Sequence, residues 1–196
     1  EGLLRTIVCA QHGLREEDEP GILAALGDDL PGAVTVSRIG DPVPGPADDA
    51  MQSSDSTSFS KDSLIRASIA GNVLKFSMKS RDQRLTLPGS GEYGDRIVKL
   101  PPPGEYDALV HNEFYVMSLA RACGIEVPDF DVVHRENVEI APSAWATTEE
   151  HAFSIARFDR SDQGRVHMED FCQAGNLPGF QRSKYQSSVE YVMKVA

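Results

Sequence analysis

The chain has 196 residues, of which 40% are hydrophobic and 25% are charged, a composition typical of a globular protein with one sizeable core or two small ones. Its formal net charge is −11, and an acidic chain repels phosphate backbones, so we expect no direct binding to nucleic acid. No stretch approaches the roughly 18 consecutive apolar residues of a membrane-spanning helix.

The N-terminal residues and the cysteines indicate the cellular compartment of the protein. Residues 1–8 lack a basic segment followed by a long apolar core, so we expect no signal peptide, and the absence of an initial Met suggests a fragment or a processed product. Cys9, Cys123 and Cys172 lie far apart and without metal-ligand spacing. We therefore expect idle thiols in a reducing compartment, and a cytoplasmic protein.

Short apolar runs separated by turns fill the first forty residues. Residues 22–26 predict a short helix that ends at Gly27, and residues 33–36 predict a strand. Residues 40–62 are rich in Ser, Pro and Asp and contain almost no large apolar residues. Because such a segment cannot bury enough surface to offset its ordering entropy, we interpret it as a linker.

From residue 63 onward the pattern changes to strands and one helix. The segments with strand character are residues 73–78, 84–87, 96–100, 130–133 and 152–158. Residues 108–123 have helical spacing of apolar side chains, and Gly124 stands where a left-handed residue would end the helix. Several antiparallel strands with one packed helix predict an α+β lobe.

The most informative pair of residues is Lys99 and Glu113. Lys99 ends an apolar strand, and Glu113 points into the apolar stripe of the helix that follows. Opposite charges directed at one core favour meeting over separate burial, and a kinase N-lobe holds the phosphates of ATP with such a lysine and glutamate. In the alternative, Lys99 extends its ammonium group to solvent and Glu113 stabilises the first turn of its helix.

Two glycine-containing segments are candidate phosphate loops. Residues 68–75 place a small Ala-Gly pair before the strand that carries Lys75. This pair either lets backbone N–H groups approach a phosphate or forms an ordinary turn. Residues 89–94 match GxGxxG, but a strand follows instead of a helix, so we interpret them as a hairpin connection. The five histidines show no HExxH motif or close pair in the sequence and are expected at the surface or at helix caps.

Taken together, these segments resemble the HipA-like serine/threonine kinases of bacterial toxin–antitoxin systems. The matching segments are residues 26–34, 68–71 with Lys75, 97–101, 112–113 with 119–120, 124–128, 157–160, and 167–173 with 184–185. They occur in the order of the family along nearly the whole chain. ARFDR, from Ala156, and HMEDFCQ, from His167, are the most specific.

The resemblance implies a kinase N-lobe-like antiparallel sheet with one packed helix, preceded by part of a small N-terminal subdomain. It divides the chain into this subdomain (residues 1–39), the linker (40–62), the N-lobe-like domain (63–160) and the beginning of the connection to a C-lobe (161–196). The catalytic-loop Asp, its Asn partner and the metal-binding Asp of the family would lie beyond residue 196. We therefore expect the ATP-binding half of a kinase without its catalytic loop, and no catalytic or metal-binding residue in this chain.

The resemblance also implies roles for individual residues. Nucleotide contacts would come from Ala70, Gly71, Asn72, Val73, Leu74, Lys75, Lys99, Ala156, Arg157 and Phe158. Among these, Lys99 would bind the phosphates of ATP, with Glu113 positioning it, and residues 156–158 would form the hinge around adenine. Ser68 would be autophosphorylated, which ejects its loop. The cofactors of the complete kinase would be ATP and Mg²⁺.

Partners follow from the same resemblance. A HipB-like helix-turn-helix antitoxin would neutralise the kinase, and an aminoacyl-tRNA synthetase is the expected class of protein substrate. Two positions depart from the family: Val73 stands where Gln is usual, and Ala156 stands where the hinge usually begins with Glu. Both changes remove polar side chains near the nucleotide. The alternative function is a non-catalytic interaction module that binds an antitoxin or a partner kinase.

Overall fold

The computed structural model divides the chain into two compact units. The first holds Glu1–Leu30 and Thr35–Phe158, and the second holds Pro31–Val34 and Asp159–Ala196. The structure describes residues 2–37, 39, 73–89, 92–100, 108–140, 145, 149–176 and 188–195. The predicted linker and the predicted phosphate-loop residues 68–72 lie outside these ranges.

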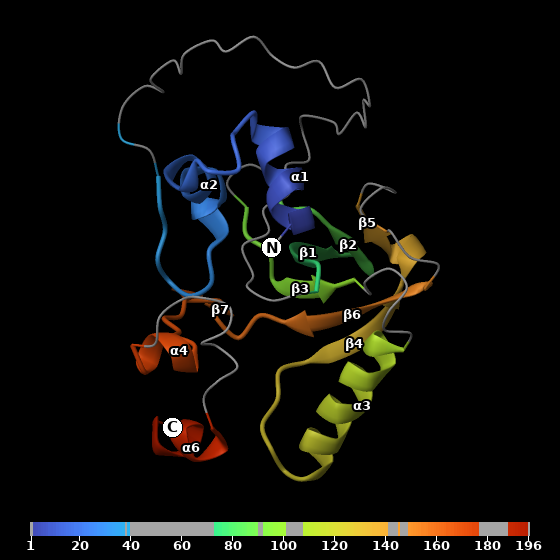
Figure 1. Ribbon diagram of the computed structural model, residues 1–196. Helices are drawn as coiled ribbons and strands as arrows, with labels where there is room; N and C mark the ends of the chain where they lie inside the picture. Colours follow the sequence, from blue (N-terminus) through green and yellow to red (C-terminus); the bar gives the residue numbers. More distant parts are fainter. Residues whose placement is uncertain are drawn as a thin grey trace. The chain divides into compact units, whose positions relative to one another are not determined.

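A six-stranded sheet forms the centre of the first unit (Figure 1). Its strands are β1 (Lys75–Arg81), β2 (Arg84–Thr86), β3 (Arg96–Lys99), β4 (Phe130–His134), β5 (Val138–Glu139) and β6 (His151–Ala156). They lie in the order β4-β6-β3-β1-β2-β5, and every neighbouring pair is antiparallel except β2 and β5. The predicted α+β class with an antiparallel-rich sheet is confirmed.

The strand predictions differ from the structure in three details. The predicted strand 152–158 ends at Ala156, and β5 was not predicted because two residues carry no alternation. Residues 89–94 connect β2 to β3, which lie on either side of β1, so the predicted hairpin connection is wrong. The carboxylate of Glu92, in this connection, accepts hydrogen bonds from the Gly89 N–H and from the guanidinium of Arg81 at the end of β1. Both interactions hold the pKa of Glu92 below its usual value.

The two faces of the sheet carry different cores. Directly opposed residues of antiparallel strands share a face, so the register groups Phe76 with Val98 on one side and Lys75 with Lys99 on the other. The first face packs one core cluster, whose members are Phe76, Met78, Leu85, Val98, Leu100, Val138, Trp145 and Ala152. The second face carries Phe153, which packs with Val110 of the helix.

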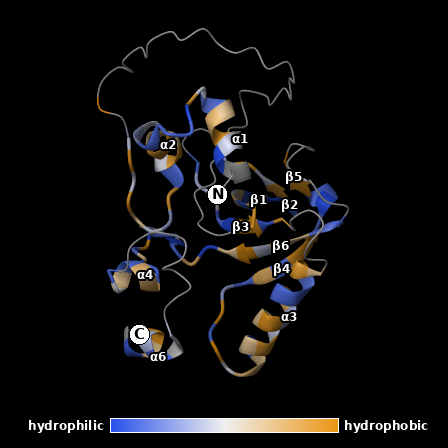
Figure 2. Ribbon diagram, viewed as in Figure 1, coloured by the Kyte–Doolittle hydropathy of each residue, from blue (hydrophilic) through white to orange (hydrophobic). Residues whose placement is uncertain are grey.

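Helix α3 (Leu109–Ala122) lies against β4 and β6 (Figure 1). It turns Val110, Phe114 and Met117 toward the sheet, and its surface is mixed in hydropathy (Figure 2). The helix ends in a Schellman motif, because Gly124 at φ +81° lets the Ile125 N–H reach the Ala120 carbonyl over 3.0 Å. The predicted helix and its glycine end are confirmed.

The N-terminal part of the first unit is helical. It consists of α1 (Gly2–His12), α2 (Glu19–Leu26) and the short 3₁₀ helix η1 (Gly27–Asp29). The predicted helix near residues 22–26 is confirmed but begins earlier, where Asp18 accepts the Gly21 N–H over 2.9 Å. The predicted strand 33–36 is wrong: these residues form no strand, and the Val36 N–H donates to Gly27 instead of to a neighbouring strand.

The second unit contains a short hairpin and two helices. The hairpin pairs β7 (Arg160–Ser161) with β8 (Gly164–Arg165), and the helices are α4 (Phe171–Ala174) and α6 (Val189–Val195). Asp170 and Gln173 form a capping box at the start of α4. Asp159 accepts the Gly32 N–H over 2.7 Å, and Arg160 donates to the Gly32 carbonyl over 3.0 Å, so residues 31–34 belong with this unit.

The connection before β3 predicts one sensitive glycine. A Cβ at Gly94 would lie 2.8 Å from the Met78 nitrogen, whereas at Gly89 the nearest atom would be the movable carboxylate of Glu92 at 3.2 Å. We expect Gly94→Ala to destabilise the chain by about 1–3 kcal/mol, because backbone cannot yield as a side chain can. Gly89→Ala is the matched control, and urea unfolding measures both. Equal stability of the two variants would contradict the packing at Gly94.

The cysteines predict a difference in reactivity. Cys9 packs with Val8 and Ile22 between α1 and α2, and burial raises the pKa of its thiol above the usual value, whereas Cys123 is exposed. In a Cys172→Ser background at pH 8, we expect an aromatic disulfide reagent to label Cys123 quickly and Cys9 slowly. In urea both thiols should react at similar rates. Equally fast labelling of both in the folded chain would refute the burial of Cys9.

Candidate functional site

The structure brings Lys99 and Glu113 together. Lys99 is the last residue of β3, Glu113 lies in the first turns of α3, and the ammonium group forms an ion pair with the carboxylate. The side chains are 26% and 24% exposed, so the pair is screened from water but reachable from it. The Lys99 ammonium also lies 5.3 Å from the centre of the Phe153 ring, which is attractive for a cation. The alternative in which Lys99 and Glu113 act separately does not describe this structure.

Lys75 stands beside this pair. It is directly opposite Lys99 in the ladder of β1 and β3, and Phe153 is directly opposite Lys99 in the ladder of β3 and β6. The three side chains therefore form one row on one face of the sheet. Two cations at opposed positions repel each other, and a carboxylate beside one of them offsets the repulsion in part. Such an arrangement can hold an anion.

The rest of the predicted phosphate loop is only partly described. Ser68, Ala70, Gly71 and Asn72 lie outside the described residues. Val73 and Leu74 immediately precede β1. The Leu74 carbonyl accepts the Leu100 N–H over 2.9 Å, and its side chain packs against the core cluster on the face opposite Lys75. Leu74 thus extends the sheet, and of the described loop residues Lys75 carries the charge.

The three predicted hinge residues end the first unit. The Ala156 N–H donates to the Asp129 carbonyl over 2.7 Å, and the Arg157 N–H donates to the Asp95 carbonyl over 2.9 Å. The Arg157 side chain turns inward and pairs with Asp29 over 2.9 Å, while Phe158 is 63% exposed. Any contribution of Arg157 to a ligand therefore has to come from its main chain.

Sequence reasoning missed the residues that receive the Arg157 side chain. Asp29 is 2% exposed and Ser77 is 1% exposed, and both bind the guanidinium group. Asp29 lies in the residue 26–34 motif, but no pattern of spacing links that motif to Arg157. An acidic residue at a helix end is usually exposed, so the sequence carried no signal that Asp29 would be buried.

Three of the five histidines come together in space. The rings of His111 and His151 lie 5.6 Å apart, and those of His134 and His151 lie 5.4 Å apart, edge to face. His134 also caps the short helix η2 (Arg135–Asn137) by accepting the Glu136 N–H. The expectation of a capping role holds for His134, but no pattern in the sequence indicated the cluster. His111, His134 and His151 come from α3, β4 and β6.

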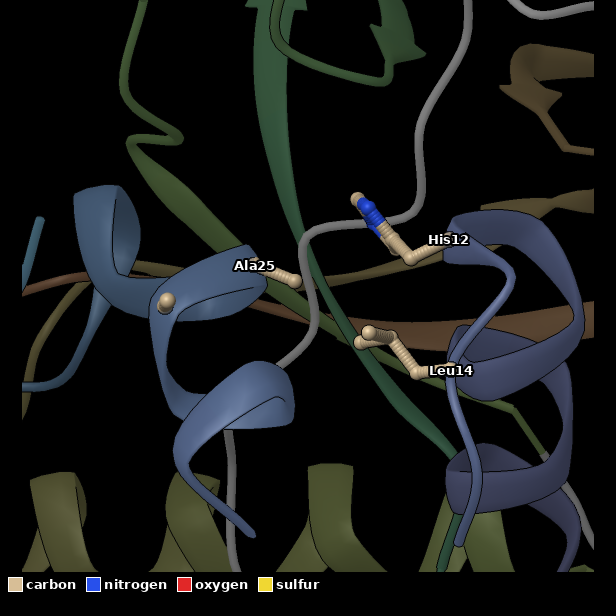
Figure 3. A pocket seen from close by; sticks show the side chains of 4 residues that line it. His12, Leu14 and Ala25 are labelled. Carbon is tan, nitrogen blue, oxygen red and sulfur yellow. The ribbon is translucent and has the colours of Figure 1, made fainter. Parts of the chain in front are cut away.

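A pocket between α1 and α2 lies apart from these residues. Its walls are His12, Leu14, Ala24 and Ala25, and Figure 3 shows His12, Leu14 and Ala25 turned toward it. Small and apolar side chains dominate this lining. None of the residues predicted to contact a nucleotide belongs to it.

Two further properties concern only the part of the chain that the structure describes. There, no group of three or more His, Cys, Asp or Glu side chains is arranged to hold a metal ion. Within the same ranges, no helix combines the length and the apolar character needed to cross a bilayer.

The antiparallel-rich sheet with its packed helix is a fold that known structures share. The fold matches that of HipA from Shewanella oneidensis, solved in complex with HipB and operator DNA, with a TM-score of 0.58 and 22% sequence identity over 95% of this chain and 44% of that one. At that identity the likeness concerns the fold.

The family follows from sequence comparison. A family model described as the HipA-like C-terminal domain matches residues 67–196. The chain is 37% identical over 177 residues to the putative kinase Y4dM of Sinorhizobium fredii, covering 88% of this chain and 42% of that protein. It is 33% identical over 129 residues to the putative kinase Y4mE of the same organism, covering 63% and 27%. The chain belongs to the HipA-like family, as its motifs predicted, and spans less than half the length of these relatives.

A double-mutant cycle measures how strongly Lys99 and Glu113 interact. For Lys99→Met and Glu113→Gln we expect a coupling of about 1 kcal/mol, because the pair is three-quarters shielded from water. Arg96 and Asp129 are the control pair, at 3.1 Å with Asp129 77% exposed, and should couple by less than about 0.5 kcal/mol. Unfolding in urea gives each value. A coupling near zero for the first pair would contradict the ion pair.

Proposed function

We propose that this chain is the ATP-binding portion of a HipA-like serine/threonine protein kinase. The observation that carries the proposal is the ion pair of Lys99 with Glu113, at the end of a strand and the start of the helix packed on the sheet. A lysine held in this way presents a fixed positive charge, which is what a transferring phosphoryl group requires.

The residues present fit the triphosphate of ATP. Lys75 and Lys99 are directly opposed on one face of the sheet, so together they would attract a polyanion. The main chain at Ala156–Phe158 would meet the adenine base, and Ala70–Asn72, with Val73 and Leu74, would border the phosphates. The described residues offer no carboxylate cluster for Mg²⁺, so any metal would depend on groups elsewhere in the kinase.

The activity of the whole protein is a further part of the proposal. When bound, ATP supplies the phosphoryl group, and the catalytic residues would come from the part of the relatives that this chain does not span. Autophosphorylation at Ser68 and a protein substrate such as an aminoacyl-tRNA synthetase rest on the family resemblance. A cytoplasmic location is supported by the three free cysteines.

The proposed partner is a HipB-like helix-turn-helix antitoxin. The Shewanella oneidensis HipA of similar fold was solved with HipB and operator DNA. The net charge of −11 on this chain opposes direct contact with DNA, so a partner that itself binds DNA is the simpler arrangement.

A second candidate is a non-catalytic interaction module. Val73 and Ala156 replace the Gln and Glu that the family resemblance leads us to expect, which removes polar groups from the neighbourhood of the nucleotide. A chain of this kind would bind an antitoxin or a partner kinase through its folded surface, and the loss of Lys99 would not affect that binding.

ATP binding by the 196-residue chain separates the two candidates. We expect Lys99→Ala to raise the Kd for ATP about tenfold or more, because a charged hydrogen bond contributes about 1.5–3 kcal/mol. Lys79→Ala is the control, since Lys79 lies on the neighbouring strand β1 and pairs with Asp95 over 2.9 Å. Isothermal titration calorimetry gives both constants. No ATP binding by the unsubstituted chain, with HipB-like partner binding retained, would favour the interaction module.

A further inference from the structure

A buried ion pair joins two segments that lie 128 residues apart in the sequence. Arg157 donates to Asp29 over 2.9 Å, and the two side chains are 2% and 1% exposed. An uncompensated charge at such a depth is very unfavourable, so each side chain requires the other. The pair therefore fixes where η1 meets the residue that follows β6.

The pair is also bound to the sheet. The same Arg157 nitrogen donates to the Ser77 hydroxyl over 2.8 Å, and the Gly94 N–H donates to the second carboxylate oxygen of Asp29 over 3.3 Å. Ser77 belongs to β1, and Gly94 precedes β3. Because the Arg157 main-chain N–H is bound to Asp95 as well, this residue is held at both its backbone and its side chain.

This rigid point lies directly beside the predicted hinge. The Ala156 and Arg157 N–H groups donate to the carbonyls of Asp129 and Asp95, which immediately precede β4 and β3. The next N–H along the chain is that of Phe158. Within the described part of the chain, the Phe158 N–H donates to no main-chain carbonyl, and the Phe158 side chain is 63% exposed. Because Arg157 is held at its backbone and its side chain, the main chain of the next residue, Phe158, is restricted to a narrow range of positions.

We propose that Asp29 is a positioning residue for base recognition: through Arg157 it sets the main chain at Ala156–Phe158 against the adenine of ATP. The inference rests on the proposed ATP binding and adds a role for the N-terminal segment. A buried ion pair contributes little net stability compared with an apolar pair, but it is satisfied in only one geometry. That property suits a positioning role better than a purely stabilising one.

Under this proposal, different groups would hold the base and the phosphates of ATP. The effect of Asp29 on base recognition can therefore be measured separately from the effect of the lysines on phosphate binding. Lys75 and Lys99 act on charge and do not distinguish one base from another. A main-chain N–H at Phe158 does distinguish them, because the N1 atom of adenine accepts a hydrogen bond, whereas the N1–H of hypoxanthine donates one. Base selectivity therefore reports on the hinge, and overall affinity reports on the lysines.

The experiment compares ATP with inosine triphosphate in the 196-residue chain. We expect the unsubstituted chain to bind ATP at least about tenfold more tightly, and Asp29→Asn to reduce that ratio to near one. Lys99→Ala should weaken both nucleotides and leave the ratio unchanged. Asp28→Asn, at the exposed neighbouring residue, should alter neither. Thermal melting by circular dichroism confirms that each variant is folded.

The outcomes distinguish the two claims. If the unsubstituted chain binds neither nucleotide, the proposed ATP binding fails first. If it prefers ATP and Asp29→Asn keeps the same ratio, ATP binding stands and the positioning role of Asp29 is overturned. If Asp29→Asn does not fold, the double variant Asp29→Leu/Arg157→Leu removes both charges and leaves none unpaired. A preserved ATP preference in that variant overturns the positioning role as well.

Discussion

The buried pairing of Asp29 with Arg157 is the constraint on which much of the first unit depends. It connects η1 through Asp29, strand β1 through Ser77, the connection before β3 through Gly94, and the end of β6. Segments far apart in the sequence are thereby held at one point. Charged groups in a low-dielectric interior tolerate few alternative arrangements. The Asp29–Arg157 contact therefore restricts the relative positions of these segments more than an apolar contact of the same size would.

The sheet register then decides which side chains share a face. The ladder of β1, β3 and β6 aligns Lys75, Lys99 and Phe153 in one row, and α3 brings Glu113 to Lys99 from above that row. A shift of one residue in β3 would turn Lys99 into the core cluster that contains Val98 and separate it from Glu113. The geometry of the lysine–glutamate pair is thus a consequence of strand pairing and not of the helix alone.

The sequence predicted the features that depend on short-range patterns. Alternation and helical spacing located β1 to β4, β6 and α3, and Gly124 marked the end of α3. Patterns failed where partners are distant: the strand expected at residues 33–36 has no neighbouring strand, and β5 is too short to show a period. The partner of Arg157 and the histidine cluster could not be read either, because only the folded chain brings those residues together.

The opposed lysines Lys75 and Lys99 show how a candidate site can be recognised by its unfavourable contribution to folding stability. Lys75 and Lys99 are directly opposed in the ladder of β1 and β3, and like charges at opposed positions disfavour strand pairing. A threonine or valine at either position would suit the strand better. Two opposed cations at one end of two strands are a local conflict of the kind that functional sites carry. Under the proposed function, the negative charge of a bound polyanion would stabilise this row.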